Sequence, residues 1–194
     1  MDLFTALHTR RSIRRYTNQP VPPDLIDRFF DAATRAPSAH NSQPWRFAVV
    51  TTSDVKAQLA DQMAERLRSD RLREADQVEK IDRDVARSRA RITAAPVVVV
   101  ACLSAIDLDD QRERLMAIQS VAASIQNMLL AAHEAGLGAC WMAAPLYCPE
   151  VVREVLQLPD DWEAQALITI GYPKGADEGK PKERVDFREK TVYR

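Results

Sequence analysis

The sequence is poor in glycine, and this excludes the common backbone sites for nucleotides. Only 5 of its 194 residues are glycine, and neither a G-x-G-x-x-G fingerprint nor a G-x-x-x-x-G-K-[ST] loop is present. A Rossmann dinucleotide site and a Walker phosphate loop both need glycines at fixed spacing. Any phosphate is therefore expected to be held by side chains.

The sequence also lacks excess positive charge and long apolar runs. The formal net charge is −1 at pH 7, so we expect no binding to nucleic acid and none to an anionic membrane. No apolar run reaches the roughly 20 residues that a membrane-spanning helix needs. The first residues lack the basic and apolar regions of a signal peptide, and we therefore expect a cytoplasmic protein.

Residues that bind metals or form disulfides are scarce. There are three cysteines, Cys102, Cys140 and Cys148. The odd number, with two of them in apolar segments, suits a reducing compartment. There are three histidines, His8, His40 and His133. They share no close spacing with one another or with the cysteines, so we expect no metal site.

The length and composition predict one globular domain over residues 1–194. The chain is 46 % hydrophobic and 28 % charged, which are ordinary globular values. Two parts depart from this pattern, a charged helical segment at about 65–93 and a polar tail at about 174–194. Composition alone would make the tail disordered. If it is ordered, it must pack on something, most simply another subunit.

Apolar spacing predicts alternating helices and strands. Helices are expected from Asp2, from Pro22 and Pro23, from Ser53 or Asp54, from Asp109 or Asp110 to about Ala135, and from Pro149. Strands are expected over 45–51, 96–102, 137–142 and 163–172. The helix that ends near Ala135 carries Leu115, Ile118, Ile125 and Leu129 on an unusually wide apolar surface. Such a helix is buried on several sides, in a core or in a dimer interface.

Residues 35–47, which read RAPSAHNSQPWRF, join a predicted helix to a predicted strand. A purely structural turn needs only Gly, Pro, Asn or Ser. This one adds the side-chain amides of Asn41 and Gln43, which can bond a flat polar heterocycle, and Trp45, which we expect to lie beneath it. The turn is therefore a candidate ligand site.

Residues 10–16 read RRSIRRY and contain four arginines and a serine. Arginine forks match phosphate oxygens, although a run of this kind is also typical of a solvated basic surface. Ile13 and Tyr16 favour the phosphate site, because they can fix the segment to the core. The charged segment at 65–93 has two interpretations as well. It is either an exposed helical excursion or a mobile lid that brings Arg68, Asp70 and Arg71 to a substrate.

Five motifs in order resemble the nitroreductase family of FMN-dependent oxidoreductases over essentially the whole chain. They are RRSIRRY at 10–16, APSAHNSQPW at 36–45, GLGACW at 136–141, IGYP at 170–173 and K-x-R at 182–184. The resemblance implies an α+β fold with a mixed β-sheet flanked by helices. It also implies an intertwined homodimer with one FMN at each of two sites between the subunits.

The same resemblance implies roles for individual residues. The FMN phosphate and pyrimidine edge would be held by Arg10, Ser12 and Arg14, with Arg11 contributing its backbone. The partner subunit would supply Pro37, Ser38, Ala39 and Asn41. Ala143 and Ala144 would lie at the isoalloxazine face near N5. The phosphate would also be contacted by Lys182 and Arg184, and the tail would wrap the partner. A second ligand would face Asp70 and Arg68.

A closer resemblance is to the reductase domain fused to the deazaflavin coenzyme:L-glutamate ligase. It rests on the AHNSQPW form of the turn and on residues 140–146 and 158–167. The ligase domain is absent here. Ala143 stands where many simple nitroreductases carry an acidic residue.

The function that this implies is two-electron hydride transfer through FMN by a ping-pong mechanism, with NADH or NADPH as reductant and no catalytic side chain. The acceptor would be a dehydro precursor of the deazaflavin coenzyme. One alternative is a general NAD(P)H-dependent nitro or quinone reductase. Another is a flavin or deazaflavin binding protein without turnover.

Overall fold

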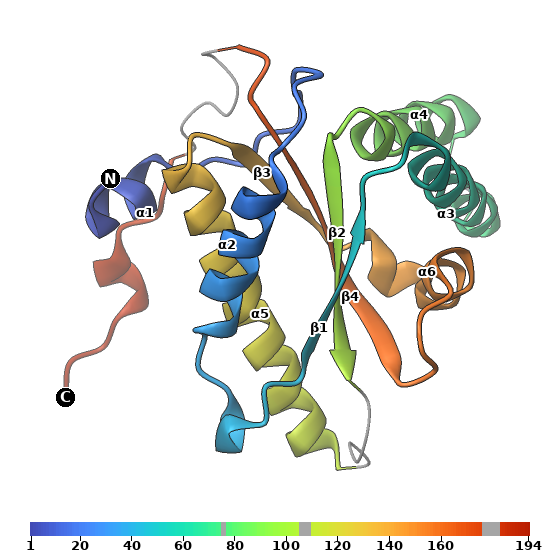
Figure 1. The fold of residues 1–194 in the computed structure, drawn as a ribbon. Helices are drawn as coiled ribbons and strands as arrows, with labels where there is room; N and C mark the ends of the chain where they lie inside the picture. The colour runs from blue at the N-terminus through green and yellow to red at the C-terminus, as the bar shows by residue number, and fades with distance from the viewer. Residues whose placement is uncertain (75–76, 105–109, 176–182) are drawn as a thin grey trace.

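The computed structural model describes residues 1–74, 77–104, 110–175 and 183–194. Figure 1 shows a central sheet with α2 and α5 on one face and α3, α4 and α6 on the other. The helices are α1 (Leu3–Thr9), α2 (Pro23–Thr34), α3 (Ser53–Arg73), α4 (Val78–Thr93), α5 (Gln111–Glu134) and α6 (Pro149–Leu156). The strands are β1 (Trp45–Val50), β2 (Val97–Ser104), β3 (Gly138–Met142) and β4 (Trp162–Gly171). Short 3₁₀ helices are η1 (Ala39–Asn41), η2 (Ala144–Tyr147) and η3 (Phe187–Lys190).

The sheet has four strands in the order β1-β2-β4-β3. All three neighbouring pairs of these strands are antiparallel, and Val99 pairs with both Val49 and Ile168. Parallel pairing enters only as an isolated bridge between Ser12 and Ala139 among the described residues. The predicted α+β fold with helices around a sheet is confirmed, although its named strands form an antiparallel sheet rather than a broadly mixed one.

The sheet separates two hydrophobic cores, and the apolar run of β2 contributes to both. Successive side chains of a strand point to opposite faces. Val97 and Val99 therefore pack with α2 and α5, while Val98 and Val100 pack with α3, α4 and α6. This explains why β2 is apolar throughout instead of alternating, as the sequence predicts for a central strand.

Helix α5 begins and ends where the sequence predicts. Asp110 caps its start by accepting a hydrogen bond from the Arg112 N–H, and Gly136 follows its end with φ of 77°, a left-handed conformation that favours glycine. Most of the predicted apolar surface is buried, including Ile125 and Leu129, whereas Leu115 is 55 % exposed. The N-terminal end of the helix therefore extends beyond the core of this chain.

Helix α5 is long and apolar enough to cross a membrane by length and composition. It packs instead against α2 and the sheet, and we interpret it as the core helix of this fold.

The charged segment forms the second half of α3 and all of α4. These helices pack against each other, and α4 buries Ile81 and Ile92. Ion pairs join them, including Arg68 to Asp82 and Arg89 to Asp61. In this structure the segment is a packed helical hairpin, and these two ion pairs lie on partly exposed side chains.

Candidate functional site

The basic segment at 10–16 is fixed to the edge strand β3. The Ile13 N–H donates to the Ala139 carbonyl at 3.0 Å, and the Tyr16 hydroxyl donates to the Ile13 carbonyl at 2.5 Å. A Cβ added to Gly138 would lie 2.5 Å from the Ile13 Cβ, so this close approach requires glycine. Ile13 and Tyr16 are buried, as the sequence predicts for residues that anchor the segment.

Arg10 lies close to other cations. Partial burial lowers the pKa of Arg10, and the charges of Arg184 and Arg11 lower it further. Arg184 is thus brought from the C-terminal part of the chain to the predicted phosphate site, as the resemblance implies. Lys182, its predicted companion, lies outside the described residues.

Arg91, from the last turn of α4, belongs to the same cationic group. Burial lowers its pKa first, and the charge of Arg14 lowers it next. The charges of Arg14, Arg91 and Arg10 each lower the pKa of the Cys140 thiol. Burial raises this pKa by more, so the net shift is upward. We call Arg10, Arg14, Arg91 and Arg184 the arginine cluster.

Within the described ranges, no member of the arginine cluster forms an ion pair with a carboxylate. Bringing like charges together without a counterion is unfavourable, so the arrangement is typical of a site for an anion. Arg91 was not predicted, because in the sequence it is one arginine among several in a charged helix. No local signal separates it from Arg87 or Arg89.

Arg11 behaves differently from its neighbours. Its guanidinium turns back and donates to the carbonyls of His8, at 2.6 Å, and Arg10, at 2.8 Å. Its buried Nε has no hydrogen-bond partner in the part of the chain that is described. The side chain is thus engaged with the local backbone, which is compatible with the predicted contribution of Arg11 through its main chain.

The turn at 36–45 has a strained backbone. His40, Asn41 and Gln43 have φ of 52°, 54° and 46°, in the left-handed region that non-glycine residues seldom adopt. The turn is held by a hydrogen bond from the Gln43 N–H to the Ser38 Oγ at 3.1 Å. Strain of this kind persists where the surroundings enforce it and is concentrated at functional sites.

The side chains of the turn divide into an exposed and a buried group. Pro37 and Asn41 are exposed, and Ser38 and Ala39 are half-buried. Trp45 is only 6 % exposed and packs in the core beside α2 and α5. The prediction that Trp45 lies beneath a ligand is therefore wrong. Trp45 begins the edge strand β1, and its large side chain is used for core packing.

One chain does not bring the turn and the arginine cluster together. The Ala39 N–H donates to the Ser120 Oγ at 3.4 Å, whereas Thr9 bonds the His133 Nε2 at 2.8 Å, next to Arg10. Ser120 and His133 are thirteen residues apart on α5, which at 1.5 Å per residue is about 20 Å. A site that uses both regions therefore needs a second copy.

Ala143 and Ala144 follow β3, and the bridge from Ser12 contacts its other end at Ala139. Ala139 and Ala143 are four residues apart, which is about 13 Å along a strand. Ala143 and Ala144 therefore lie at the end of β3 opposite to the basic segment. Ala143 is exposed and Ala144 half-buried. Their size leaves the backbone there accessible to a flat ligand.

Beside Ala144 there is a pocket of about 400 Å³. It is lined by Met63, Arg66, Leu67, Asp70, Arg71, Glu74, Ser88, Ala144, Tyr147 and Cys148. Asp70, a predicted substrate residue, belongs to this lining. Arg68, the other one, does not, because it pairs with Asp82 on α4.

The sequence matches a known protein family and relatives of known sequence. A model described as the nitroreductase family matches residues 7–172. An NADH dehydrogenase of Thermus thermophilus is 32 % identical over 225 residues, covering 100 % of this chain and 97 % of that protein. A Methanothermobacter thermautotrophicus protein, provisionally named an NADH dehydrogenase/NAD(P)H nitroreductase, is 34 % identical over 177 residues, covering 89 % of this chain and 78 % of that protein.

Solved structures agree with this match. A BluB-like flavoprotein of Clostridium difficile has a TM-score of 0.82 at 25 % identity, and the match covers 100 % of this chain and 99 % of that one. A nitroreductase-like protein of Bacillus cereus shares the fold with a TM-score of 0.79 at 22 % identity, covering 100 % and 96 % of the two chains. The family match over residues 7–172, together with relatives above 30 % identity, shows that this chain belongs to the nitroreductase family.

Proposed function

We propose that this chain is an FMN-dependent oxidoreductase that takes reducing equivalents from NADH or NADPH. The observation that carries the proposal is the arginine cluster, in which cations gather without carboxylate partners among the described residues. FMN has an anionic phosphate at one end and a flat ring system at the other. The chain offers cations near one end of β3 and small side chains at the other, so its residues fit this cofactor.

Bound FMN would supply two-electron hydride chemistry. The chain would supply the binding site and the electrostatics. Arg10, Arg14, Arg91 and Arg184 would hold the phosphate and the pyrimidine edge through charge-assisted hydrogen bonds. Ser12 and the backbone of Arg11 would add polar contacts, and Lys182 would join the phosphate site.

The alanines would keep one face of the ring open. Ala143 and Ala144 offer no polar side chain and little bulk at the end of β3. An open face admits the reductant first and the acceptor afterwards, so ping-pong kinetics are expected. No side chain of this chain is required as nucleophile or general base.

The complete site would require a homodimer. The separation of about 20 Å along α5 means that Pro37, Ser38, Ala39 and Asn41 would serve the site of the other copy. Large apolar side chains are exposed on α1, where Phe4 is 71 % exposed, and on the C-terminal arm, where Val192 is 77 % and Tyr193 is 82 % exposed. Both elements lie at the outer edge of the molecule, away from the sheet (Figure 1).

A second copy would cover these surfaces, with the tail at about 174–194 wrapped around it. Light scattering at micromolar concentration is expected to give the mass of a dimer. A monomer that still binds FMN would contradict the shared site.

The pocket beside Ala144 favours an uncharged acceptor, such as a nitroarene or a quinone, and therefore a general nitro or quinone reductase. In the pocket beside Ala144 the charges of Arg66 and Arg71 are balanced by Asp70 and Glu74, which suits an uncharged acceptor. Reduction of a dehydro deazaflavin precursor and the similarity to the ligase-fused reductase domain stay predictions.

Anaerobic reduction of the bound flavin is the deciding experiment. The purified protein is expected to be yellow, and its FMN absorbance is expected to bleach with NADH or NADPH. Reoxidation is then followed with a quinone, a nitroarene and the deazaflavin precursor. A colourless protein that takes up no FMN would refute the proposal. Flavin that stays oxidised with both nicotinamides would instead support a binding protein without turnover.

The state of the cysteines supports a reducing compartment. All three are free and buried, which suits a reducing environment. We therefore propose a cytoplasmic enzyme whose partners are a second copy and small molecules.

A further inference from the structure

The pocket beside Ala144 combines an apolar base with a charged rim. Met63, Leu67 and Cys148 supply apolar surface, and Tyr147, which is 76 % exposed, stands at its edge. Its volume of about 400 Å³ lies within the usual range for small-molecule pockets. This inference rests on the proposed function, because it takes Ala144 to lie at the flavin face.

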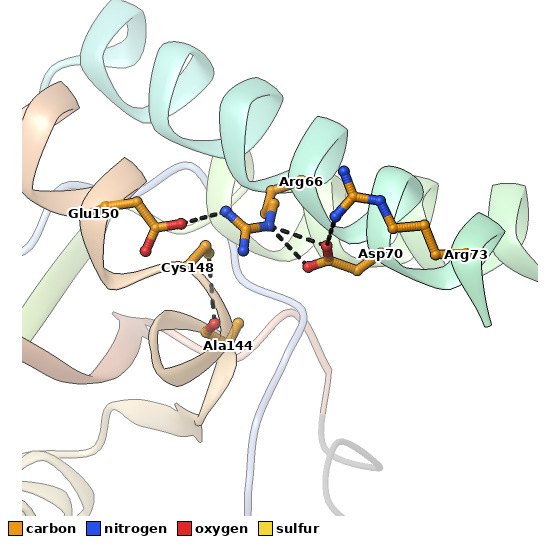
Figure 2. Close-up of polar contacts among 6 residues, drawn as sticks. All are labelled: Arg66, Asp70, Arg73, Ala144, Cys148 and Glu150. Carbon is orange, nitrogen blue, oxygen red and sulfur yellow. Dashed lines mark hydrogen bonds and ion pairs between the residues drawn. The ribbon is translucent and has the colours of Figure 1, made fainter.

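Arg66 is a cation of this pocket that two carboxylates hold in place. Its Nε donates to both oxygens of Asp70, at 3.1 and 2.9 Å, and its Nη1 donates to Glu150 on α6. Figure 2 shows the guanidinium between these two carboxylates, above Cys148 and Ala144. Arg73 contacts Asp70 from the far side at 3.7 Å, which helps to keep that carboxylate in place.

The two carboxylates restrict Arg66 without using all its donors. A guanidinium has five N–H groups in a rigid fork. Among the described residues, Asp70 and Glu150 are its polar partners, and they engage Nε and Nη1. The Nη2 group is therefore available to an oxygen of a ligand in the pocket that Arg66 lines.

The charge of the lining is balanced. Arg71 lies 3.9 Å from Glu74, so each of the two arginines in the lining has a carboxylate of the lining beside it. Asp70 and Glu74 cancel the attraction that Arg66 and Arg71 would otherwise exert on an anionic ligand. An uncharged ligand with a carbonyl or nitro oxygen does not depend on that attraction.

We propose that Arg66 is a positioning residue that hydrogen-bonds an oxygen of an uncharged aromatic acceptor, and that Asp70 and Glu74 select against anionic acceptors. Asp70 and Glu150 fix the direction of the Arg66 fork, so the acceptor is bound in one orientation over the flavin. Arg66 remains charged throughout and transfers no proton. Its role is confined to binding and orientation.

Arg68 provides a matched control for Arg66. It lies on the same helix and pairs across to another element, but it faces Asp82 outside the pocket. The FMN-loaded enzyme is reduced chemically without nicotinamide and mixed anaerobically with 1,4-naphthoquinone. Arg66→Gln is expected to raise the apparent Kd for the quinone about tenfold, the loss of one hydrogen bond to a charged group. Arg68→Gln and the FMN affinity of both variants are expected to match the unsubstituted enzyme.

Arg66→Lys provides a second test in case the glutamine variant does not fold. Lysine keeps the charge beside Asp70 but lacks the fork, so the Kd is again expected to rise, by about threefold. Equal Kd values for Arg66→Gln and Arg68→Gln, or an unchanged Kd for Arg66→Lys, would overturn the role of Arg66. Failure to bind FMN at all would overturn the proposed function instead, so the two failures are distinguishable.

A second arm tests the selection by charge. The anionic probe is 1,4-naphthoquinone-2-sulfonate, and Glu74→Gln is compared with Asp82→Asn, which removes a carboxylate paired outside the pocket. Glu74→Gln is expected to lower the Kd for the sulfonate severalfold at low salt and to leave the neutral quinone unaffected. An equal effect of both substitutions, or no effect of either, would overturn the selection by charge.

Discussion

Two regions of this protein use the same side chain for opposite purposes. In the α3–α4 hairpin, Arg68 and Arg89 each pair with a carboxylate across the two helices. In the arginine cluster, Arg10 and Arg14 have no carboxylate partner among the described residues and lie near further arginines. The boundary passes through one helix, because Arg87 and Arg89 of α4 are paired while Arg91 belongs to the cluster.

The difference teaches that counting arginines does not locate a site. Exposed ion pairs contribute little to stability, so the hairpin arginines mainly satisfy local charge. Unpaired cations that are held together need an anion to relieve their repulsion. Substitutions in the two groups of arginines test this contrast.

Removing a cluster arginine is expected to have the largest effect. Arg14→Ala removes a charge-assisted contact worth about 1.5–3 kcal/mol, which is roughly a 10- to 150-fold loss of FMN affinity. Quenching of flavin fluorescence on titration measures it. Arg91→Ala is expected to behave in the same way. An affinity equal to that of the unsubstituted protein would remove the substituted residue from the site.

A displacement of the basic segment that leaves its charge unchanged is expected to have the next largest effect. In Gly138→Ala the added Cβ would lie 2.5 Å from the Ile13 Cβ, so the segment must shift, at about 1–3 kcal/mol of folding free energy. Thermal melting and FMN titration should both show the change. Gly175→Ala is the control, because a Cβ there meets nothing within 4 Å. Equal melting temperatures for the two variants would contradict this packing.

Protonation near the cluster is expected to have a smaller effect. Partial burial, and then the charges of Arg10 and Arg11, lower the pKa of His133. The unfolded chain, with an ordinary pKa of about 6.5, then binds the proton first as the pH falls. Stability is therefore expected to fall as the pH decreases from about 6.5 towards the lower folded pKa.

Melting curves across this pH range, without FMN, test the role of His133. His133→Gln should flatten the pH dependence, since glutamine does not titrate. Bound phosphate near Arg10 should weaken it too, because it offsets part of the positive charge. A variant with the full pH dependence of the unsubstituted protein would show that other groups cause it.

Removing a hairpin arginine is expected to have the smallest effect. Arg89 and Asp61 are both about half exposed, and exposed pairs of this kind contribute little. Arg89→Ala should leave FMN affinity unchanged and shift the urea midpoint only slightly. A loss of FMN affinity comparable to that of Arg91→Ala would remove the contrast between the two arginine groups.

The local features of the fold could be predicted well from the sequence. The strand at 97–104, the cap at Asp110 and the glycine after α5 depend on residues close together in the chain. The anchoring of the basic segment by Ile13 and Tyr16 was also predicted, since buried side chains within a polar run are visible in the sequence. The prediction that Trp45 lies beneath a ligand was wrong, because the residues around Trp45 do not indicate which face of the strand is buried.

Residues close together in the chain fix the elements, the motifs and the residue types of the candidate site, because hydrophobic periodicity and capping act over a few residues. The packed fold decides which arginines are paired, that Arg91 joins Arg14, and that the turn and the segment beside the cluster contact α5 at points about 20 Å apart. These outcomes depend on contacts between residues distant in the sequence, such as Arg89 with Asp61 and Ala39 with Ser120. No local pattern records such contacts, since they form only when the layers pack.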